Sequence, residues 1–556
     1  MRPSPAAASL LILLLGLPLA WALAAALMAG GDAAAWQALA SDSQFQSATW
    51  MSLWTGTAST LLALGIAAKL LSGVFPGPAW SRLVRGLGPL LAVPHVAFAI
   101  GLMALISPSG WVLRALSPWL TGFTSPPGWL TTQDPWGLGL IAVLTFKEVP
   151  FLLWAAATQL QRGDAAPRLA RELDVARSLG YAPGTAWWRV VWPQLWPRLR
   201  WPLLAVLGYS LTVVDVALVI GPTSPPTLAV LAWQWLQDAD LAQNAQGAAA
   251  AWVLTSLVVL VAGVLWQLPK WSSWRVRWTN GHRGRPSGAL PGRPAFGRPV
   301  GPSVLVAVYL AVMAALAAGS VSGVWAFPAL LPQSFTTDAW ISVGSSLGSV
   351  GTTLTLALTS AAASLVWSVA WLESAPARWD NRLRKTIYLP LVLPSVLWIV
   401  GLHQLTVFWG LDASWSGVWL AHCLATLPYV LIALSPAYLG FDARCWAISA
   451  SLGKSRWQFL LQVKWPLLRA SLLGAAAVGF AVSVAQYLPT LFIGAGRYST
   501  VTTEAVSMAS GAQRSLTSAY AALQWLLPVL GFALAAWLGQ PRRYSQQTII
   551  ADVSHQ

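Results

Sequence analysis

Charged residues are scarce in this chain of 556 residues: Asp, Glu, Lys and Arg together make up 9%, whereas apolar residues make up 56%. Soluble proteins carry about 25% charged residues, so a soluble globular fold is excluded. Cysteine is also rare, and Cys423 and Cys445 provide neither a disulfide framework nor a metal site. The composition therefore places the chain in the integral membrane class.

Motifs for nucleotide binding and catalysis are also missing. Lys454 lies between a glycine and a serine, but Ile448 occupies the place where a phosphate-binding P-loop needs its first glycine. The sequence contains no Gly-x-Ser-x-Gly, no His-Glu-x-x-His and no Cys–His pair in a plausible frame. We therefore expect no enzyme chemistry, no cofactor and no metal site in this chain.

Long apolar runs recur along nearly the whole chain. A bilayer-spanning helix needs about 20 predominantly apolar residues, because only a helix satisfies its backbone polar groups within one segment. The alternating pattern of a transmembrane β-barrel is not evident. We predict an all-α polytopic membrane protein with about twelve transmembrane helices. The spans are expected at 8–28, 50–75, 87–107, 136–160, 201–221, 247–268, 303–326, 346–372, 386–408, 416–439, 467–493 and 516–540.

The net charge of +16 does not indicate a nucleic-acid partner, because the basic residues are sorted between alternate loops. By the positive-inside rule, the basic loops and both termini are predicted to be cytoplasmic, in a bacterial inner membrane. The basic loops hold Arg82, Arg85, Arg162, Arg168, Arg171, Arg177, Arg189, Arg198, Arg200, Arg378, Arg382, Arg384, Lys385, Arg444, Lys454, Arg456, Lys464, Arg542 and Arg543. The opposite loops hold Asp32, Asp42, Asp238, Asp240, Asp338 and Asp412, with Arg114, Arg497 and Arg514 as the basic exceptions.

Two repeats are predicted, at residues 1–268 and 303–540, each with about six spans. Between them, residues 269–302 are rich in Arg, Gly, Pro and Ser and lack a helical apolar stripe, which predicts a cytoplasmic linker. Binding of this segment to acidic lipid is the alternative to a solvated tether. Residues 541–556 are expected to form a cytoplasmic tail.

The first span follows Arg2 and also fits a secretory signal peptide. The second half opens with an equivalent apolar span at 303–326, which cannot be a signal peptide. We therefore expect the first span to be retained as a membrane helix.

The two halves share a spacing of proline and glycine that indicates an internal repeat. Pro94 and Gly101 in LLAVPHVAFAIGL match Pro394 and Gly401 in LVLPSVLWIVGL. Further on, FKEVPFLLWA and LATLPYVLIA each carry a proline inside a late span, at positions 150 and 428. Each of these spans leads into a polar, basic loop.

Those two basic loops carry the most specific pattern in the sequence. DVARSLG and AISASLG predict short helices that end at a glycine with positive φ. Apolar residues at helical spacing then continue until a proline marks the entry of the next span. The residues at matching offsets are Gly180, Val190, Trp192 and Pro193 in the first loop and Gly453, Val463, Trp465 and Pro466 in the second.

Both loops resemble the EAA signature of type I binding-protein-dependent ABC permeases: EAA, three residues, Gly, nine residues, Ile, one residue, Leu-Pro. The EAA positions are occupied by Asp174, Val175 and Ala176 in the first copy and by Ala447, Ile448 and Ser449 in the second, which lacks the acid. The resemblance covers nearly the whole chain apart from the linker and implies a MetI-like permease fold. The fused two-copy layout is most similar to the iron(III), thiamine and related small-solute importers.

The resemblance also implies partners. In the family, this loop forms a coupling helix that docks in a groove of the ATPase subunit; the alternative is a re-entry loop that packs on its own bundle. ATP hydrolysis would then belong to a separate ATPase subunit, in two copies, and solute delivery to a periplasmic solute-binding protein; membrane lipid surrounds the spans. The residues to which the family assigns ATPase coupling are Asp174, Ala176, Gly180, Val190, Pro193, Ala447, Gly453, Val463 and Pro466.

Polar and ionisable residues inside spans are costly and indicate function. The translocation-path candidates are Lys147, Glu148, Asp215 and Gln486, with His95, His403, Gln404 and His422 as weaker candidates. Adjacent helix residues point about 100° apart, so Lys147 and Glu148 cannot both face one narrow stripe, and one is predicted to face a cavity. A buried packing pair is the alternative.

The rival to an ABC importer permease is a secondary transporter driven by an ion gradient, for which twelve spans and a repeat are also ordinary. The paired motifs favour the importer, because a gradient-driven carrier needs no ATPase docking site.

Overall fold

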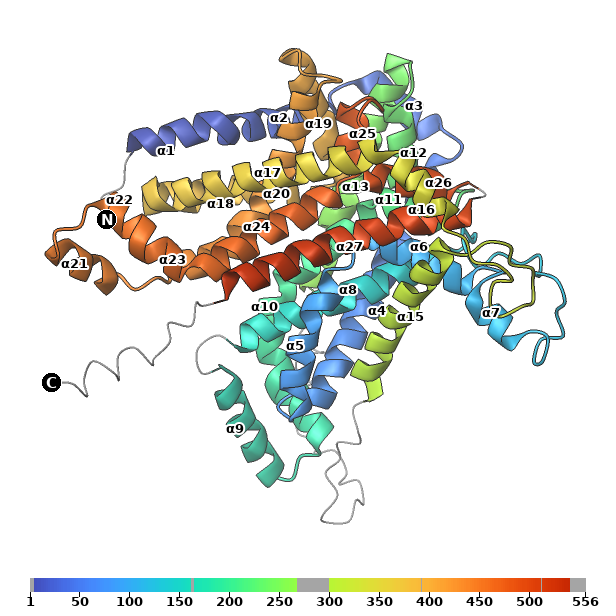
Figure 1. Cartoon of the computed structure of the whole chain (residues 1–556), viewed down its shortest axis with the longest axis horizontal. Coiled ribbons are helices and arrows are strands. Elements are labelled where there is room, and N and C mark those ends of the chain that lie inside the picture. The colour runs from blue at the N-terminus through green and yellow to red at the C-terminus, as the bar shows by residue number, and fades with distance from the viewer. Residues whose placement is uncertain (1–4, 162–164, 268–299, 392, 512, 541–556) are drawn as a thin grey trace.

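The computed structural model describes residues 5–161, 165–267, 300–391, 393–511 and 513–540, and it is built almost entirely of helices (Figure 1). No strand forms within these ranges, where one isolated bridge pairs Ser322 with Phe335. The predicted all-α class is confirmed. The predicted tail and the predicted linker lie outside the described residues, except that 300–302 belong to a helix.

The two halves lie on either side of the undescribed segment 268–299. The first half contains α1 (Pro5–Leu11), the π-helical η1 (Ile12–Gly16), α2 (Leu17–Met28), α3 (Ala33–Ser41), α4 (Phe45–Val74), α5 (Ala79–Leu91), α6 (His95–Ile106), α7 (Trp111–Leu116), α8 (Leu138–Leu160), α9 (Ala165–Ser178), α10 (Pro183–Thr212), α11 (Asp215–Ile220), α12 (Leu228–Leu236) and α13 (Leu241–Gln267). The second half contains α15 (Val300–Ser320), α16 (Asp338–Ser345), α17 (Leu347–Ser374), α18 (Ala377–Tyr388), the 3-10 helix η3 (Leu389–Leu391), α19 (Ser395–Phe408), α20 (Trp415–Leu439), α21 (Arg444–Ser451), α22 (Arg456–Phe459), the π-helical η4 (Leu460–Lys464), α23 (Trp465–Leu467), α24 (Arg469–Val484), α25 (Leu488–Ile493), α26 (Val501–Ala509) and α27 (Arg514–Gly539).

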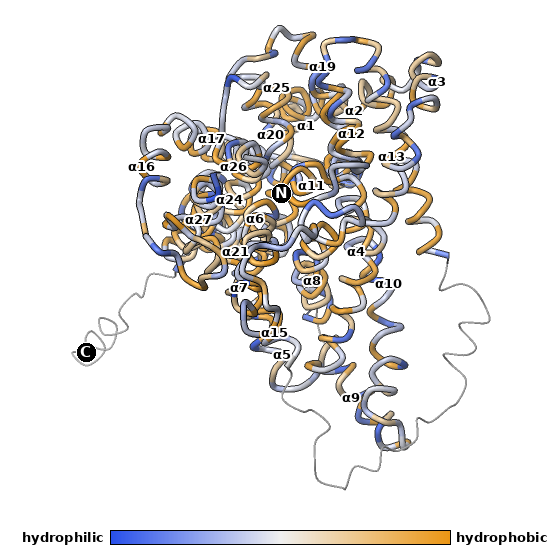
Figure 2. Tube along the Cα trace, turned by 90° about the vertical axis from the view of Figure 1, so that its right-hand side faces the viewer, coloured by the Kyte–Doolittle hydropathy of each residue, from blue (hydrophilic) through white to orange (hydrophobic). Residues whose placement is uncertain are grey.

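Helices that can cross a bilayer make up most of the molecule. Among the described residues, nine helices are long and apolar enough to do so. The number rises to eleven if each of two bent pairs forms one span: Ala377–Leu391 with Ser395–Phe408, and Arg456–Leu467 with Arg469–Val484. Hydrophobic residues predominate along these helices (Figure 2). Eleven of the twelve predicted spans thus have a counterpart, and the bent pairs, with angles of 111° and 75°, correspond to the predictions at 386–408 and 467–493.

The prediction of one continuous span at 201–221 was wrong. α10 ends at Thr212, Val213 has an extended backbone (ψ 133°), and α11 begins at Asp215. Val213 and Val214 are consecutive β-branched residues, which disfavour the helical conformation. The second half is interrupted at the same place, because α24 ends at Val484 and α25 begins only at residue 488.

The predicted span 87–107 begins too early. Pro94 has an extended backbone (ψ 151°) and separates α5 from α6, so the span starts at His95. A proline lacks the N–H that would continue the helix and restricts the residue before it. α5 is instead amphipathic: it buries Leu83, Leu87 and Leu90 and exposes Arg82 and Arg85.

The internal repeat is visible in the order of elements at the end of each half. A long helix, a short helix, a loop, a second short helix and a final long helix follow one another as α10 to α13 and again as α24 to α27. One hydrogen bond is repeated as well. Ser52 Oγ in α4 accepts from the Leu228 N–H at 2.9 Å, and Thr353 Oγ1 in α17 accepts from the Val501 N–H at 2.9 Å.

The first span of each half packs on the other half. α2 lies along α19, and α15 lies along α6. The repeat glycines occupy these crossings: a Cβ on Gly401 would lie 1.8 Å from the Ala22 carbonyl oxygen, and one on Gly101 would lie 2.7 Å from that of Val312. The sequence repeat Pro-x6-Gly therefore marks the positions where exchanged helices approach most closely.

Candidate functional site

The first basic loop, called here the first motif loop (residues 165–193), is a helix–turn–helix. α9 ends two residues before Gly180, whose φ is +87°. The Gly180 N–H donates to the Arg177 carbonyl at 2.9 Å, and the Tyr181 N–H donates to the Ala176 carbonyl at 3.2 Å. This pair of bonds is a Schellman turn, which satisfies the last carbonyls of a helix.

The second motif loop (residues 444–466) contains the same turn at the same offsets. Gly453 has φ +72°, and its N–H donates to the Ala450 carbonyl at 3.0 Å. The Lys454 N–H donates to the Ser449 carbonyl at 3.0 Å. The prediction that both glycines adopt positive φ at a helix end is confirmed.

The motif residues also match in exposure, position by position. Asp174 and Ala447 are exposed, Val190 and Val463 are half-buried, and Pro193 and Pro466 are exposed. Ala176, at the third EAA position, is buried, as is its counterpart Ser449. The asymmetry at the first EAA position remains: the Asp174 carboxylate, 71% exposed, pairs with Arg177 at 3.2 Å, whereas Ala447 has no charge to offer.

Each motif loop exposes a pair of apolar side chains one turn apart. Val175 and Leu179 are 60% and 59% exposed, and the equivalent Ile448 and Leu452 are 61% and 73% exposed. Figure 1 shows α21 at the left and α9 at the bottom of the view, both away from α3, α12 and α26. Large apolar side chains exposed at equivalent positions of two loops indicate a surface that a partner covers.

The proline at the end of the motif behaves differently in the two halves. Pro193 lies inside α10, which runs without interruption to Thr212, so the loop continues into the next span without a break at the proline. Pro466 lies in α23, next to the 75° bend that leads into α24.

The first motif loop is held by apolar packing, with Leu173, Trp187 and Val191 buried in the hydrophobic core. Four tryptophans also pack in a row along α10: ring centroids lie 5.0 Å apart for Trp187 and Trp188, 5.3 Å for Trp188 and Trp192, and 5.8 Å for Trp192 and Trp196. Gln194 Nε2 donates to Glu172 Oε2 at 2.7 Å and so links α10 to α9.

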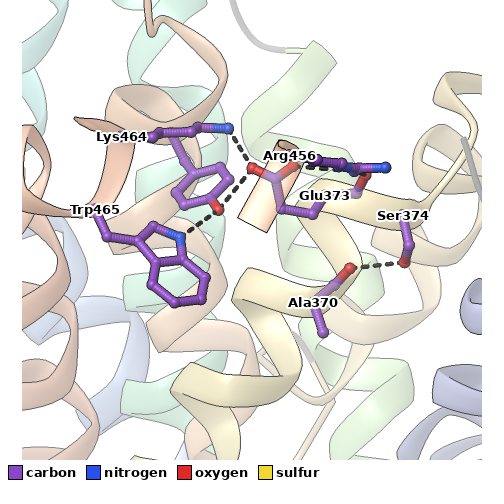
Figure 3. Close-up of polar contacts among 7 residues, drawn as sticks. Ala370, Glu373, Ser374, Arg456, Lys464 and Trp465 are labelled. Atoms are coloured by element: carbon purple, nitrogen blue, oxygen red, sulfur yellow. Dashed lines mark hydrogen bonds and ion pairs between the residues drawn. The ribbon is translucent and has the colours of Figure 1, made fainter. Parts of the chain in front are cut away.

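The second motif loop is held by charge. Glu373, in the last turn of α17, forms an ion pair through Oε1 with Lys464 and accepts through Oε2 from Arg456 Nη2 at 3.2 Å (Figure 3). Tyr438 from α20 donates to Glu373 Oε1 at 2.8 Å, and Trp465 Nε1 donates to Tyr438 Oη at 3.1 Å. We call these five residues the Glu373 cluster. The sequence analysis missed Glu373, because it lies at the end of an apolar span and belongs to no motif.

Lys147 and Glu148 point to different neighbours, as the helical geometry predicted. Lys147 Nζ donates to the Val93 carbonyl at 2.6 Å and so satisfies the end of α5. Glu148 Oε1 lies 3.2 Å from His95 Nε2, where the His95 side chain is 33% exposed and that of Glu148 is 8% exposed. The carboxylate therefore reaches a partly accessible group, whereas the ammonium is buried against backbone.

Asp215 and Gln486 both lie where a long helix is interrupted. Asp215 is the first residue of α11, and Gln486 lies two residues before α25; both are half-buried. The His95 ring packs against that of Tyr209, with 4.7 Å between ring centroids. Tyr209 was also missed, because tyrosines occur throughout apolar spans and give no distinct signal.

The two remaining histidine candidates bond to residues of the second half, and Gln404 is exposed. His422 is buried and bonds Ser483 Oγ at 2.7 Å and Thr490 Oγ1 at 2.9 Å. His403 Nε2 lies 3.3 Å from Asp412 Oδ1. In the described part of the chain, no three His, Cys, Asp or Glu side chains form a group that could hold a metal ion.

Comparison with known proteins extends over almost the entire chain. The inner membrane ABC transporter permease protein YnjC of Escherichia coli (strain K12) is 36% identical over 518 residues, which cover 91% of this chain and 92% of the relative. The molybdenum transport system permease protein ModB of Azotobacter vinelandii is 28% identical over 197 residues, 33% of this chain but 85% of the relative. No family model matches. A helical membrane chain with two motif loops and a full-length relative of this kind belongs to the family of ABC transporter permeases.

Proposed function

We propose that this one chain supplies both halves of the membrane unit of an ABC importer, and that two copies of a separate ATPase subunit dock on its two motif loops. A periplasmic binding protein delivers a small solute to the opposite side. The observation that carries the proposal is the matched pair of exposed apolar side chains, Val175 with Leu179 and Ile448 with Leu452. Similar surfaces on two loops suit two identical partners.

The lengths of the relatives support the division into two permease repeats, at 1–268 and 303–540. ModB of Azotobacter vinelandii matches over 85% of its own length but over only 33% of this chain. One half of this chain therefore corresponds in size to a whole single-repeat permease, and the fused chain to a pair.

The proposed translocation path lies between the halves, beside Lys147, Glu148, Asp215 and Gln486. Support comes from the partly exposed His95, Asp215 and Gln486, which lie at the starts or interruptions of helices, where transporters commonly bind their solutes. Glu148 orients His95, and Lys147 caps α5, so these two residues position the lining of the path.

Purification tests the assignment to an ATP-driven importer. We expect the chain alone to hydrolyse no ATP and to retain an ATPase subunit that is co-expressed from a neighbouring reading frame. The measurement is hydrolysis before and after the subunit is added. Solute uptake that persists in membrane vesicles without the ATPase subunit, and follows an imposed ion gradient, would instead establish the rival secondary transporter.

Reporter fusions test the orientation. The sorting of basic residues predicts that the linker is cytoplasmic and that the loop containing Asp238 is periplasmic. A reporter enzyme active only in the periplasm should be silent when fused after Pro286 and active when fused after Asp238. The reverse pattern would contradict the proposed orientation.

A further inference from the structure

The Glu373 cluster joins three segments that are distant in sequence. Glu373 lies in the last turn of α17, Tyr438 in the last turn of α20, and Arg456 and Lys464 in the second motif loop (Figure 3). The Glu373 and Lys464 side chains are 8% and 6% exposed. Arg456 Nη2 also donates to the Glu373 backbone carbonyl at 2.8 Å. Both spans are thus connected to the loop through one carboxyl group.

The first half has no such cluster at the equivalent positions. Val191 lies eleven residues after Gly180, as Lys464 lies eleven after Gly453, and Leu160 lies ten after Pro150, as Tyr438 lies ten after Pro428. Counted along α4 and α17 from the repeated hydrogen bonds of Ser52 and Thr353, the counterpart of Glu373 is Ser72. The counterparts of Tyr438, Arg456 and Lys464 are Leu160, Pro183 and Val191. Val191 and Leu160 are 0% and 1% exposed, so apolar packing replaces the ion pairs.

Equivalent positions in the two halves are therefore stabilised differently, by ion pairs in the second half and by apolar packing in the first. A buried ion pair adds little net stability relative to well-packed apolar residues, because burial of the charges costs about as much as their attraction gains. Ion pairs do fix geometry, however, since displacement of one partner leaves a buried charge unpaired.

We infer that Glu373 is a positioning residue that fixes the second motif loop to α17 and α20. The second loop meets α24 at a 75° bend, whereas the first motif loop continues without a break into α10 and needs no such link. This inference rests on the proposed docking of the ATPase. Motion of the ATPase subunit at the second loop is then passed to α17 and α20 through the Glu373 cluster, and motion at the first loop is passed along α10.

Hydrogen exchange of the purified chain alone tests the rigidity. Glu373→Gln leaves Lys464 unpaired and should accelerate amide exchange in residues 444–467 at least about tenfold, while residues 165–193 stay unchanged. Glu172→Gln is the matched control, because this more exposed acid in the first motif loop should change exchange by less than about twofold. Equal acceleration in both loops, or none, would overturn the inference.

A second variant separates positioning from folding. Glu373→Ser, Tyr438→Leu and Lys464→Val together install three of the four residues of the first half and leave Arg456 in place. This variant should insert normally and retain the ATPase subunit. In a Cys445→Ser background, spin labels at Ser451 and Val366 report the distance between the loop and α17. We expect a narrow distribution that ATP leaves unchanged in the otherwise unsubstituted chain, and a broad, ATP-sensitive one in the triple variant.

The experiments distinguish failure of the positioning role of Glu373 from failure of the proposed function. A triple variant whose label distances stay narrow and unaffected by ATP would overturn the positioning role. If the unsubstituted chain retains no ATPase subunit, the proposed function fails, and the exchange measurement on the isolated chain still decides whether Glu373 fixes the loop.

Discussion

Replacement of both Leu179 and Leu452 by glutamate is expected to abolish retention of the ATPase subunit. Burial of a leucine side chain is worth about 1.5–3 kcal/mol, and a buried, unpaired carboxylate adds a further cost. Each substitution should therefore weaken its own contact by about 100-fold or more. A single substitution should be milder, because the second loop still holds its subunit. Affinity measured on the purified, lipid-embedded chain gives the result.

The control for this prediction lies one residue away on the same helices. Ser178 and Ser451 are both exposed, and adjacent helix residues point about 100° apart. Ser178→Glu with Ser451→Glu adds the same charges beside the apolar pairs and should weaken retention of the ATPase subunit far less. Equal losses for the leucine and serine variants would contradict docking through the apolar pairs.

Asp174→Ala should also weaken retention of the ATPase subunit, by about 1.5–3 kcal/mol if its carboxylate meets a basic group of the ATPase.

Gly401→Ala is expected to lower the thermal stability of the chain strongly. The added Cβ would lie 1.8 Å from the Ala22 carbonyl oxygen and 2.7 Å from the Ala26 nitrogen, both backbone atoms of α2. α2 and α19 must then separate along their crossing, at a cost of about 1–3 kcal/mol or more. Thermal unfolding of the purified chain in detergent measures this cost.

Gly474→Ala is the matched control, because Gly474 lies in α24 and a Cβ there would meet nothing within 4 Å. Alanine favours a helix by about 0.5–1 kcal/mol relative to glycine, so this variant should be as stable as the parent or more so. If the Gly401→Ala and Gly474→Ala variants unfold at the same temperature, the helices do not cross closely at Gly401.

The sequence alone was enough for the features that depend on local or periodic patterns. Apolar runs predicted most spans, and a glycine after a short polar helix predicted the turns at Gly180 and Gly453. The matching offsets counted from Gly180 and Gly453 also identified the two motif loops. Each of these signals is carried by residues close together in the chain, where propensity and spacing act directly.

Contacts between distant segments could not be predicted in this way. Apolar runs do not show which span lies beside which, so the exchange of α2 and α15 between halves left no trace beyond Gly101 and Gly401. The interruption at Val213 was hidden inside an apolar run that was long enough for one helix. Glu373 meets Lys464 and Arg456 only after folding, because residues 83 and 91 positions apart in the chain form these bonds.

The exchange of first spans also sets an order for biogenesis. α2 leaves the ribosome long before its partner α19, which belongs to the second half. Until α19 enters the bilayer, α2 presents Ala22 and Ala26 to lipid or to insertion factors rather than to a partner helix. The first half therefore cannot complete its packing during its own synthesis. Both helix bundles can complete their packing only after α15 and α19 of the second half have been synthesised. The two repeats therefore assemble as one folding unit.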